Sequence, residues 1–123
     1  MKTIKITSLL LLAFWFSSAA YAHHAAAGID RDSQVTGEGV VTQFRWANPH
    51  CWIEMDVVNK DGKTETWNLE MMPPSWLVKA GWTRSSLHVG DRVQITANPF
   101  FDGRPGGVFV SITLPDGTTL KQR

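Results

Sequence analysis

The stretch CWIEMDVVNKDGKTETWNLEM, residues 51–71, decides the fold because it reads as two β-strands joined by a tight turn. Apolar side chains alternate with acidic ones along residues 51–58, which is the two-residue period of a half-buried strand. Lys60-Asp61-Gly62 suits a three-residue hairpin loop with Gly62 in the left-handed region. A hairpin is therefore predicted, with Asn59 opposite Lys63 and a returning strand over residues 64–71.

This loop length also fixes which residues oppose each other. One face then holds the pairs Val57–Glu65, Met55–Trp67, Ile53–Leu69 and Cys51–Met71, and the other holds Asp56–Thr66, Glu54–Asn68, Trp52–Glu70 and His50–Met72. A two-residue loop would mix apolar and polar residues on both faces, and a slip of one residue is penalised along the whole strand. We expect Cys51 and Trp67 in the core and an acidic outer face that carries His50 and Trp52.

Outward from the hairpin, further strands are predicted over residues 35–46, 92–97 and 108–114, with a short one over 118–120. Gly37 and Gly39 indicate a bend or bulge in the first strand, and Asn98-Pro99 is expected to end the fourth. A helical turn is predicted over residues 75–80, with Trp76 and Trp82 beside it capping a barrel end. This order predicts an all-β fold with one short helix, an OB-like five-stranded antiparallel Greek-key barrel. The alternative is a small β-sandwich.

The beginning of the chain reads as a secretory signal peptide over residues 1–22. Lys2 and Lys5 precede an apolar run too short to cross a bilayer, and small residues ending in Ala20-x-Ala22 follow. Residues 23–33 are expected to form a flexible, exposed arm, and residues 34–123 a single barrel domain. Cleavage after Ala22 leaves 10 basic and 11 acidic residues, a formal charge of −1. We therefore expect a periplasmic protein with no membrane span after cleavage and no nucleic-acid partner.

Residues 46–52, Trp-Ala-Asn-Pro-His-Cys-Trp, form the predicted corner between the first two strands and the expected site. A processed chain would begin with His23-His24, whose imidazoles and free α-amine are nitrogen donors suited to copper or another borderline metal. The predicted metal ligands are His23, His24, His50 and Glu70, and Trp52 and Met72 are the predicted ligand-binding neighbours. Burial is the expected state of the single cysteine, Cys51, and His88 is expected to sit in a turn.

We accordingly expect an exported, non-catalytic periplasmic binding module, with copper as the first ligand to test. The alternative is a protein-interaction module of a periplasmic complex that uses no metal, docking through the strand face or the Phe100-Phe101 loop. An enzyme with a His50–Glu70 dyad is the third reading, and it is disfavoured because Ser75, Ser85 and Ser86 lack the setting of a nucleophile.

Several short motifs resemble one bacterial family. They are His23-His24 after a signal peptide, Gly37-x-Gly39-Val40, Trp46-x-Asn48-Pro49-His50, Trp67-x-x-Glu70, Leu77-x-x-x-Gly81-Trp82-Thr83, Leu87-x-x-Gly90-Asp91-x-Val93 and Leu114-Pro115-Asp116-Gly117. Together they resemble the bacterial domain-of-unknown-function family 6152, small exported proteins, over nearly the whole processed chain. The resemblance implies a small periplasmic β-barrel and no particular activity. Cys51 and Met71-Met72-Pro73 depart from the family pattern.

Overall fold

The predicted hairpin is present in the structure, a computed structural model that describes residues 28–123. Strands β2 (Trp52–Val58) and β3 (Thr64–Glu70) pair in the expected register, with Met55 opposite Trp67 and Trp52 opposite Glu70. Asn59 N–H donates to the Lys63 carbonyl at 2.8 Å, and Gly62 has a φ of 75°. The three-residue loop is confirmed, and with it the separation of an apolar inner face from a polar outer face.

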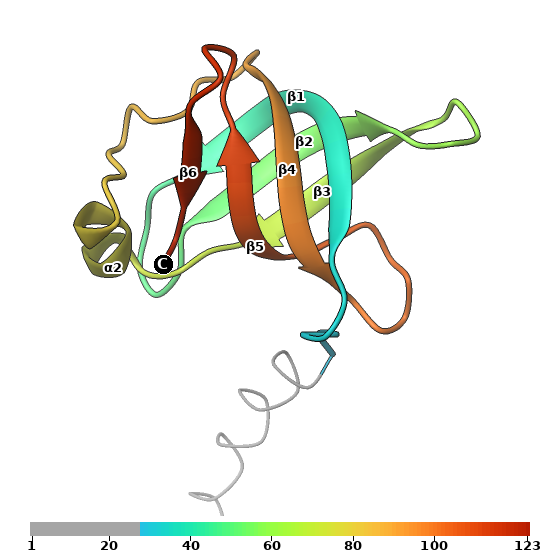
Figure 1. The fold of residues 1–123 in the computed structure, drawn as a ribbon, viewed down its shortest axis with the longest axis horizontal. Helices are drawn as coiled ribbons and strands as arrows, with labels where there is room; N and C mark the ends of the chain where they lie inside the picture. The colour runs from blue at the N-terminus through green and yellow to red at the C-terminus, as the bar shows by residue number, and fades with distance from the viewer. Residues whose placement is uncertain (1–27) are drawn as a thin grey trace, which may run out of the picture.

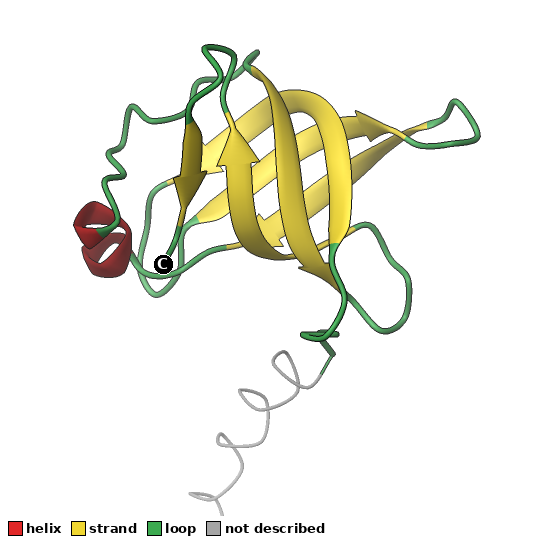
Figure 2. Ribbon diagram, in the orientation of Figure 1, coloured by secondary structure: helices red, strands yellow, loops and turns green. Residues whose placement is uncertain are grey.

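The strands close into a barrel (Figures 1 and 2). Strand β1 (Val35–Arg45) pairs antiparallel with both β2 and β4 (Arg92–Pro99), and β5 (Gly106–Thr113) pairs antiparallel with β4. Closure comes from a short parallel pairing of β3 with β5, between Asn68–Glu70 and Gly106–Val108. This five-stranded ring is the predicted OB-like barrel. The small strand β6 (Thr119–Lys121) extends it beside β5, and α2 (Pro74–Lys79) links β3 to β4.

Two details of the strands differ from expectation. The bulge of β1 lies between Val41 and Gln43, not at the glycines. The glycines instead provide room, because a Cβ at Gly39 would lie 2.0 Å from the Asp56 carbonyl oxygen. Strand β4 also continues through Asn98 and Pro99, which pair with β5. A proline is tolerated at this strand end because its missing N–H is not needed by the ladder.

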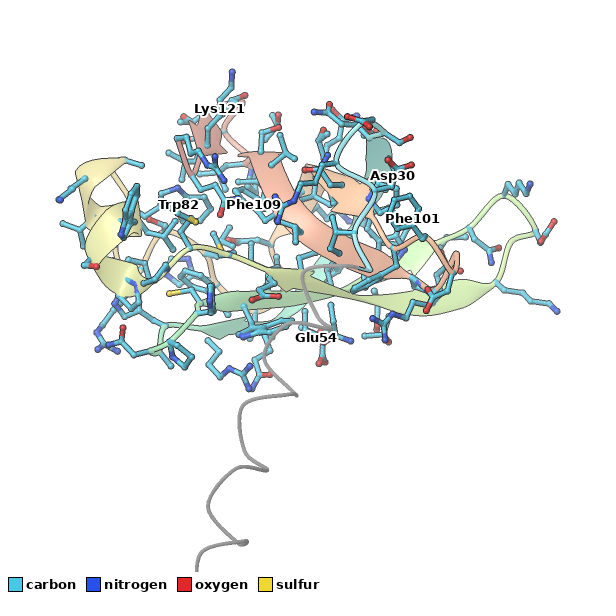
Figure 3. All side chains as sticks on the ribbon, turned by 90° about the horizontal axis from the view of Figure 1, so that it is seen from below. Asp30, Glu54, Trp82, Phe101, Phe109 and Lys121 are labelled. Carbon is cyan, nitrogen blue, oxygen red and sulfur yellow. The ribbon has the colours of Figure 1, made fainter. Side chains whose placement is uncertain are left out.

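The core lies between the β2–β3 layer and the β4–β5 layer (Figure 3). Cys51 and Met71 are buried as predicted, and so are Trp67 and Trp82. Trp76 is 55% exposed, so only Trp82 of the two helix-flanking tryptophans closes the barrel end. The Trp82 indole N–H is satisfied by the Lys121 carbonyl at 2.8 Å, which explains how a tryptophan can be fully buried there.

The segment just before β1 packs against the barrel. Ile29 is buried and forms a β-bridge with Phe100, Asp30 N–H donates to the Pro99 carbonyl, and Phe101 N–H donates to the Gly28 carbonyl. Residues 28–30 therefore do not form the exposed arm expected over 23–33, because Ile29 has an apolar side chain that the β4–β5 loop can cover. The signal peptide and residues 23–27 lie outside the described residues. Within residues 28–123, no helix is long and apolar enough to cross a membrane.

Candidate functional site

The predicted corner joins the end of β1 to the start of β2. Pairing continues one step beyond the β2–β3 ladder, because Met71 N–H donates to the Cys51 carbonyl at 2.9 Å and Cys51 N–H donates to the Met72 carbonyl at 3.3 Å. These bonds hold the corner against the chain that leaves β3. His50 is consequently placed beside Glu70 and Met71, at the edge of the outer face.

The His50 ring is oriented by its Nδ1 atom. Nδ1 lies 2.7 Å from the Met71 carbonyl oxygen and 3.5 Å from Glu70 Oε1, and the two side chains are 40% and 32% exposed. A carbonyl oxygen can only accept, so Nδ1 donates and carries the proton in the neutral ring. The lone pair of that ring is then on Nε2, which bonds no group among residues 28–123. His50 thus offers one imidazole nitrogen to an incoming ligand.

Trp52 lies in a polar row that crosses three strands. Its neighbours across the ladders are Arg45 on β1 and Glu70 on β3, as the pairing registers give them. The Arg45 guanidinium carbon is 5.6 Å from the centroid of the Trp52 ring, within the range of a cation–π contact. Trp52 is half-buried, and the row shares the outer face of β2 with Glu54, which Figure 3 labels. The corner therefore combines an imidazole, a carboxylate, a guanidinium and an indole.

The predicted site residues are only partly brought together. The Met72 side chain is half-buried and packs against the core, so its thioether contributes to packing. Its backbone N–H donates to Gln122 Oε1 at 3.0 Å. His50 and Glu70 do meet, but the carboxylate lies on the Nδ1 side of the ring. Across the described part of the chain, no three His, Cys, Asp or Glu side chains are placed to hold a metal ion together. His23 and His24 lie outside it.

Cys51 is not available for chemistry in this fold. Its side chain is fully buried, and burial raises the pKa of the thiol, while a weak contact to the Ala47 carbonyl opposes the shift. A thiol that stays protonated is a poor nucleophile and a poor metal ligand. His88 behaves as a turn residue: its N–H donates to Asp91 Oδ2 at 2.9 Å, and its ring is 69% exposed.

Arg45 was not predicted as part of the site. The residue could be found only by pairing β1 with β2, and the bulge at Val41–Gln43 shifts that register by one residue. Without the bulge, the alternation along β1 would place Arg45 on the opposite face. The arginine therefore had no visible signal in the sequence.

Comparison with known proteins identifies the family of this chain. One solved structure that matches is the mitochondrial single-stranded DNA binding protein Rim1 of S. cerevisiae, at 15% identity and a TM-score of 0.49, covering 68% of this chain and 94% of that one. No curated protein matches the chain. A family model, described as a family of unknown function (DUF6152), matches residues 12–109. The chain, with the Asn-Pro-His corner and the barrel described above, belongs to the DUF6152 family.

Proposed function

We propose that this protein is an exported, non-catalytic periplasmic binding module whose corner binds a borderline metal ion through His50, with copper as the first ion to test. The observation that carries the proposal is the hydrogen bond between His50 Nδ1 and the Met71 carbonyl oxygen at 2.7 Å. Histidines that bind metals through one ring nitrogen usually donate the other N–H to a carbonyl or carboxylate, which fixes the tautomer and the ring plane. His50 has this arrangement.

In this proposal Glu70 supports the ligand and does not coordinate the metal. Its Oε1 lies 3.5 Å from Nδ1, on the side of the ring away from Nε2. A carboxylate beside the Nδ1–H increases the electron donation of the imidazole and so strengthens a bond at Nε2. The Glu70 role expected from sequence, direct ligation, is replaced here by a positioning role.

One protein nitrogen is too few for a specific site, and the other donors would come from the start of the processed chain. His23, His24 and the α-amine that cleavage after Ala22 would create supply up to three nitrogens. Copper(II) binds such nitrogen donors more tightly than the other divalent first-row ions do. The proposal therefore requires export and cleavage at that position, which mass measurement of the periplasmic protein checks directly.

The test is titration of copper(II) into protein exported through its own signal peptide, followed by calorimetry and electron paramagnetic resonance. His50→Ala should weaken binding by about tenfold or more and remove one nitrogen from the coupling pattern. Glu70→Gln should weaken it by a smaller factor. His88→Ala is the matched control, because it removes an exposed imidazole far from the corner in sequence and should change neither reading.

Two results would contradict the proposal. If His50→Ala binds copper as the parent does while deletion of His23-His24 abolishes binding, only a loose terminal chelate exists. If the protein does not bind the ion at all, the alternative of a protein-interaction module gains support. That alternative rests on Phe101, whose ring is 69% exposed on the β4–β5 loop. A partner retained from periplasm in the presence of a chelator would favour it.

A further inference from the structure

Strand β1 has an unpaired edge at the end of β2 farthest from the corner. Pairing of β1 with β2 begins at Gly39 opposite Val57, although β1 itself begins four residues earlier, at Val35. Strand β2 cannot continue alongside, because Asn59 turns into the hairpin loop and its Oδ1 accepts from the N–H groups of Asp61 and Lys63. The hairpin projects from the barrel while β1 curves away (Figure 1). Residues 35–38 thus have a neighbouring strand, β4, on one side only.

The backbone groups that this edge presents can be assigned. Val41 bonds toward the β4 side with both its groups: its N–H donates to the Asp91 carbonyl, and its carbonyl accepts from Gly90 N–H. Backbone bonding alternates along an antiparallel strand, and the β1–β4 register is regular from Val35 to Val40. Thr36 and Glu38 therefore direct their N–H and C=O groups away from β4. The pairing of Gly39 with Val57 brings the Glu38 carbonyl opposite the Val58 N–H, so the groups left without a strand partner are the N–H and C=O of Thr36 and the N–H of Glu38.

The space beside this edge has an apolar side and an acidic rim. A hollow there is lined by Val35, Gly37, Val57 and Trp67, with Glu38, Asp61 and Glu65 around it and Lys60 as the one cation. A second hollow on the outer side shares Glu38 and Val58 with the first, so the gap between β1 and the hairpin is open from both faces of the sheet. Val58, which lines both hollows, is 64% exposed.

We propose that this edge binds an extended peptide strand of a partner protein, with apolar side chains at alternate positions and cationic ones between them. An added strand would satisfy the N–H and C=O of Thr36 and the N–H of Glu38, as in other cases of strand addition. Gly37 faces inward, because it is in register with the fully buried Ile95. The peptide residue opposite Gly37 would therefore point toward Trp67 and should be apolar. The peptide residue opposite Glu38 would point outward, beside the Glu38 carboxylate, and should be cationic.

The probe is the peptide acetyl-Val-Lys-Val-Lys-Val-amide, titrated into the exported, processed protein and followed by amide resonances. Shifts should be concentrated at residues 35–38 and 57–58. N-methylation of the backbone amides that would face β1 should weaken binding by about tenfold. The Glu-for-Lys peptide should bind about threefold more weakly or worse. The rearranged peptide acetyl-Lys-Val-Val-Val-Lys-amide, with the same composition, should lose most of the affinity because it cannot alternate.

Two variants of the protein test the edge itself. Thr36→Pro removes an N–H that faces away from β4, so it should spare the barrel and abolish peptide binding. Glu38→Lys should weaken the lysine peptide and improve the glutamate peptide. Glu54→Lys is the matched control, since it makes the same charge change on the outer face of β2 away from the edge, and it should alter neither affinity.

Three outcomes would overturn the proposal: no binding of the alternating peptide, equal binding of the N-methylated peptide, or unchanged binding to Glu38→Lys. If the protein instead self-associates and Glu38→Lys abolishes the dimer, the occupant of the edge is a second copy of this chain, and the peptide proposal is wrong. Copper affinity should be the same for parent and Glu38→Lys, so failure here is distinguishable from failure of the corner site.

Discussion

The indole ring of Trp67 lies over Gly37, so close that a Cβ at Gly37 would come within 2.9 Å of the ring carbon Cη2. The ring fills the mouth of the barrel at the end of the core where β1 leaves the hairpin, and its Nε1 donates to Glu65 Oε1 at 3.0 Å. Two residues farther along, a Cβ at Gly39 would meet backbone first, the Asp56 carbonyl oxygen at 2.0 Å, and then the Met55 Cε at 3.0 Å. These contacts explain two glycines in the interior of a strand, where glycine ordinarily weakens the structure.

Alanine at Gly39 should destabilise the barrel more than alanine at Gly37. The methyl group at position 39 would force β1 and β2 apart, whereas at position 37 the Trp67 ring can shift. We expect about 3 kcal/mol or more at Gly39 and roughly 1–2 kcal/mol at Gly37 in urea unfolding. Thr64→Ala, at an exposed position of β3, is the control with little effect. Equal costs at the two glycines would contradict this reading of the close approach.

Gln122 lies between two charged residues near the end of the sequence, yet its side chain should contribute substantially to the stability of the fold. It is the one buried polar residue of the described chain, accepting from Met72 N–H and donating to the Phe109 carbonyl. Gln122→Ala leaves both backbone groups without a partner, and we expect a loss of about 2 kcal/mol in the free energy of unfolding. Gln122→Met keeps most of the volume and should lose nearly as much. Recovery of stability by methionine would show that packing, not hydrogen bonding, is what matters there.

The tautomer of His50 can be measured without any ligand. In the neutral ring the proton should reside on Nδ1, because the Met71 carbonyl accepts from it at 2.7 Å. Long-range proton–nitrogen spectra at a pH where both rings are neutral distinguish the two tautomers. His88 is the internal reference, since its exposed ring lies 3.7 Å from Asp91 and has no such bond. A proton on Nε2 of His50 would remove the structural basis of the corner proposal.

The buried thiol of Cys51 should make the stability of the fold decrease at alkaline pH. Burial raises the pKa of Cys51, so the folded chain keeps its proton where the unfolded chain releases it. The stabilisation is complete below the unfolded thiol pKa, about 8.5, and is lost as pH rises above it, at no more than about 1.4 kcal/mol per pH unit.

Cys51→Ala is the comparison that isolates this effect. The alanine variant should be less stable at pH 7 because of the cavity, yet its stability should fall less steeply between pH 8 and pH 10. Urea unfolding at several pH values measures both quantities. Parallel curves for the two proteins would mean that the thiol ionises equally well when folded.

The hairpin and its register could be predicted because local rules decide them: alternation along 51–58, a loop ending in Gly62, and the penalty for mixing faces. The inward turn of Cys51 and the outward turn of Trp52 followed from the register alone. The bulge of β1, the burial of Gln122 and the packing of Ile29 could not be predicted, because each depends on a partner distant in sequence. The position of Arg45 beside Trp52 depends on the bulge and was missed for the same reason.

The double pairing of β1 has a consequence for how the molecule comes apart. Its first half is held by β4 and its second half by β2, and Gly39 and Val40 have a partner residue in both ladders. Without β1, the backbone pairing between the hairpin and the β4–β5 pair would be reduced to the three-residue parallel contact of β3 with β5. Neither piece could bury its apolar face alone. Loosening β1 therefore releases both layers at once, and the barrel should melt as one cooperative unit with no persistent half-barrel.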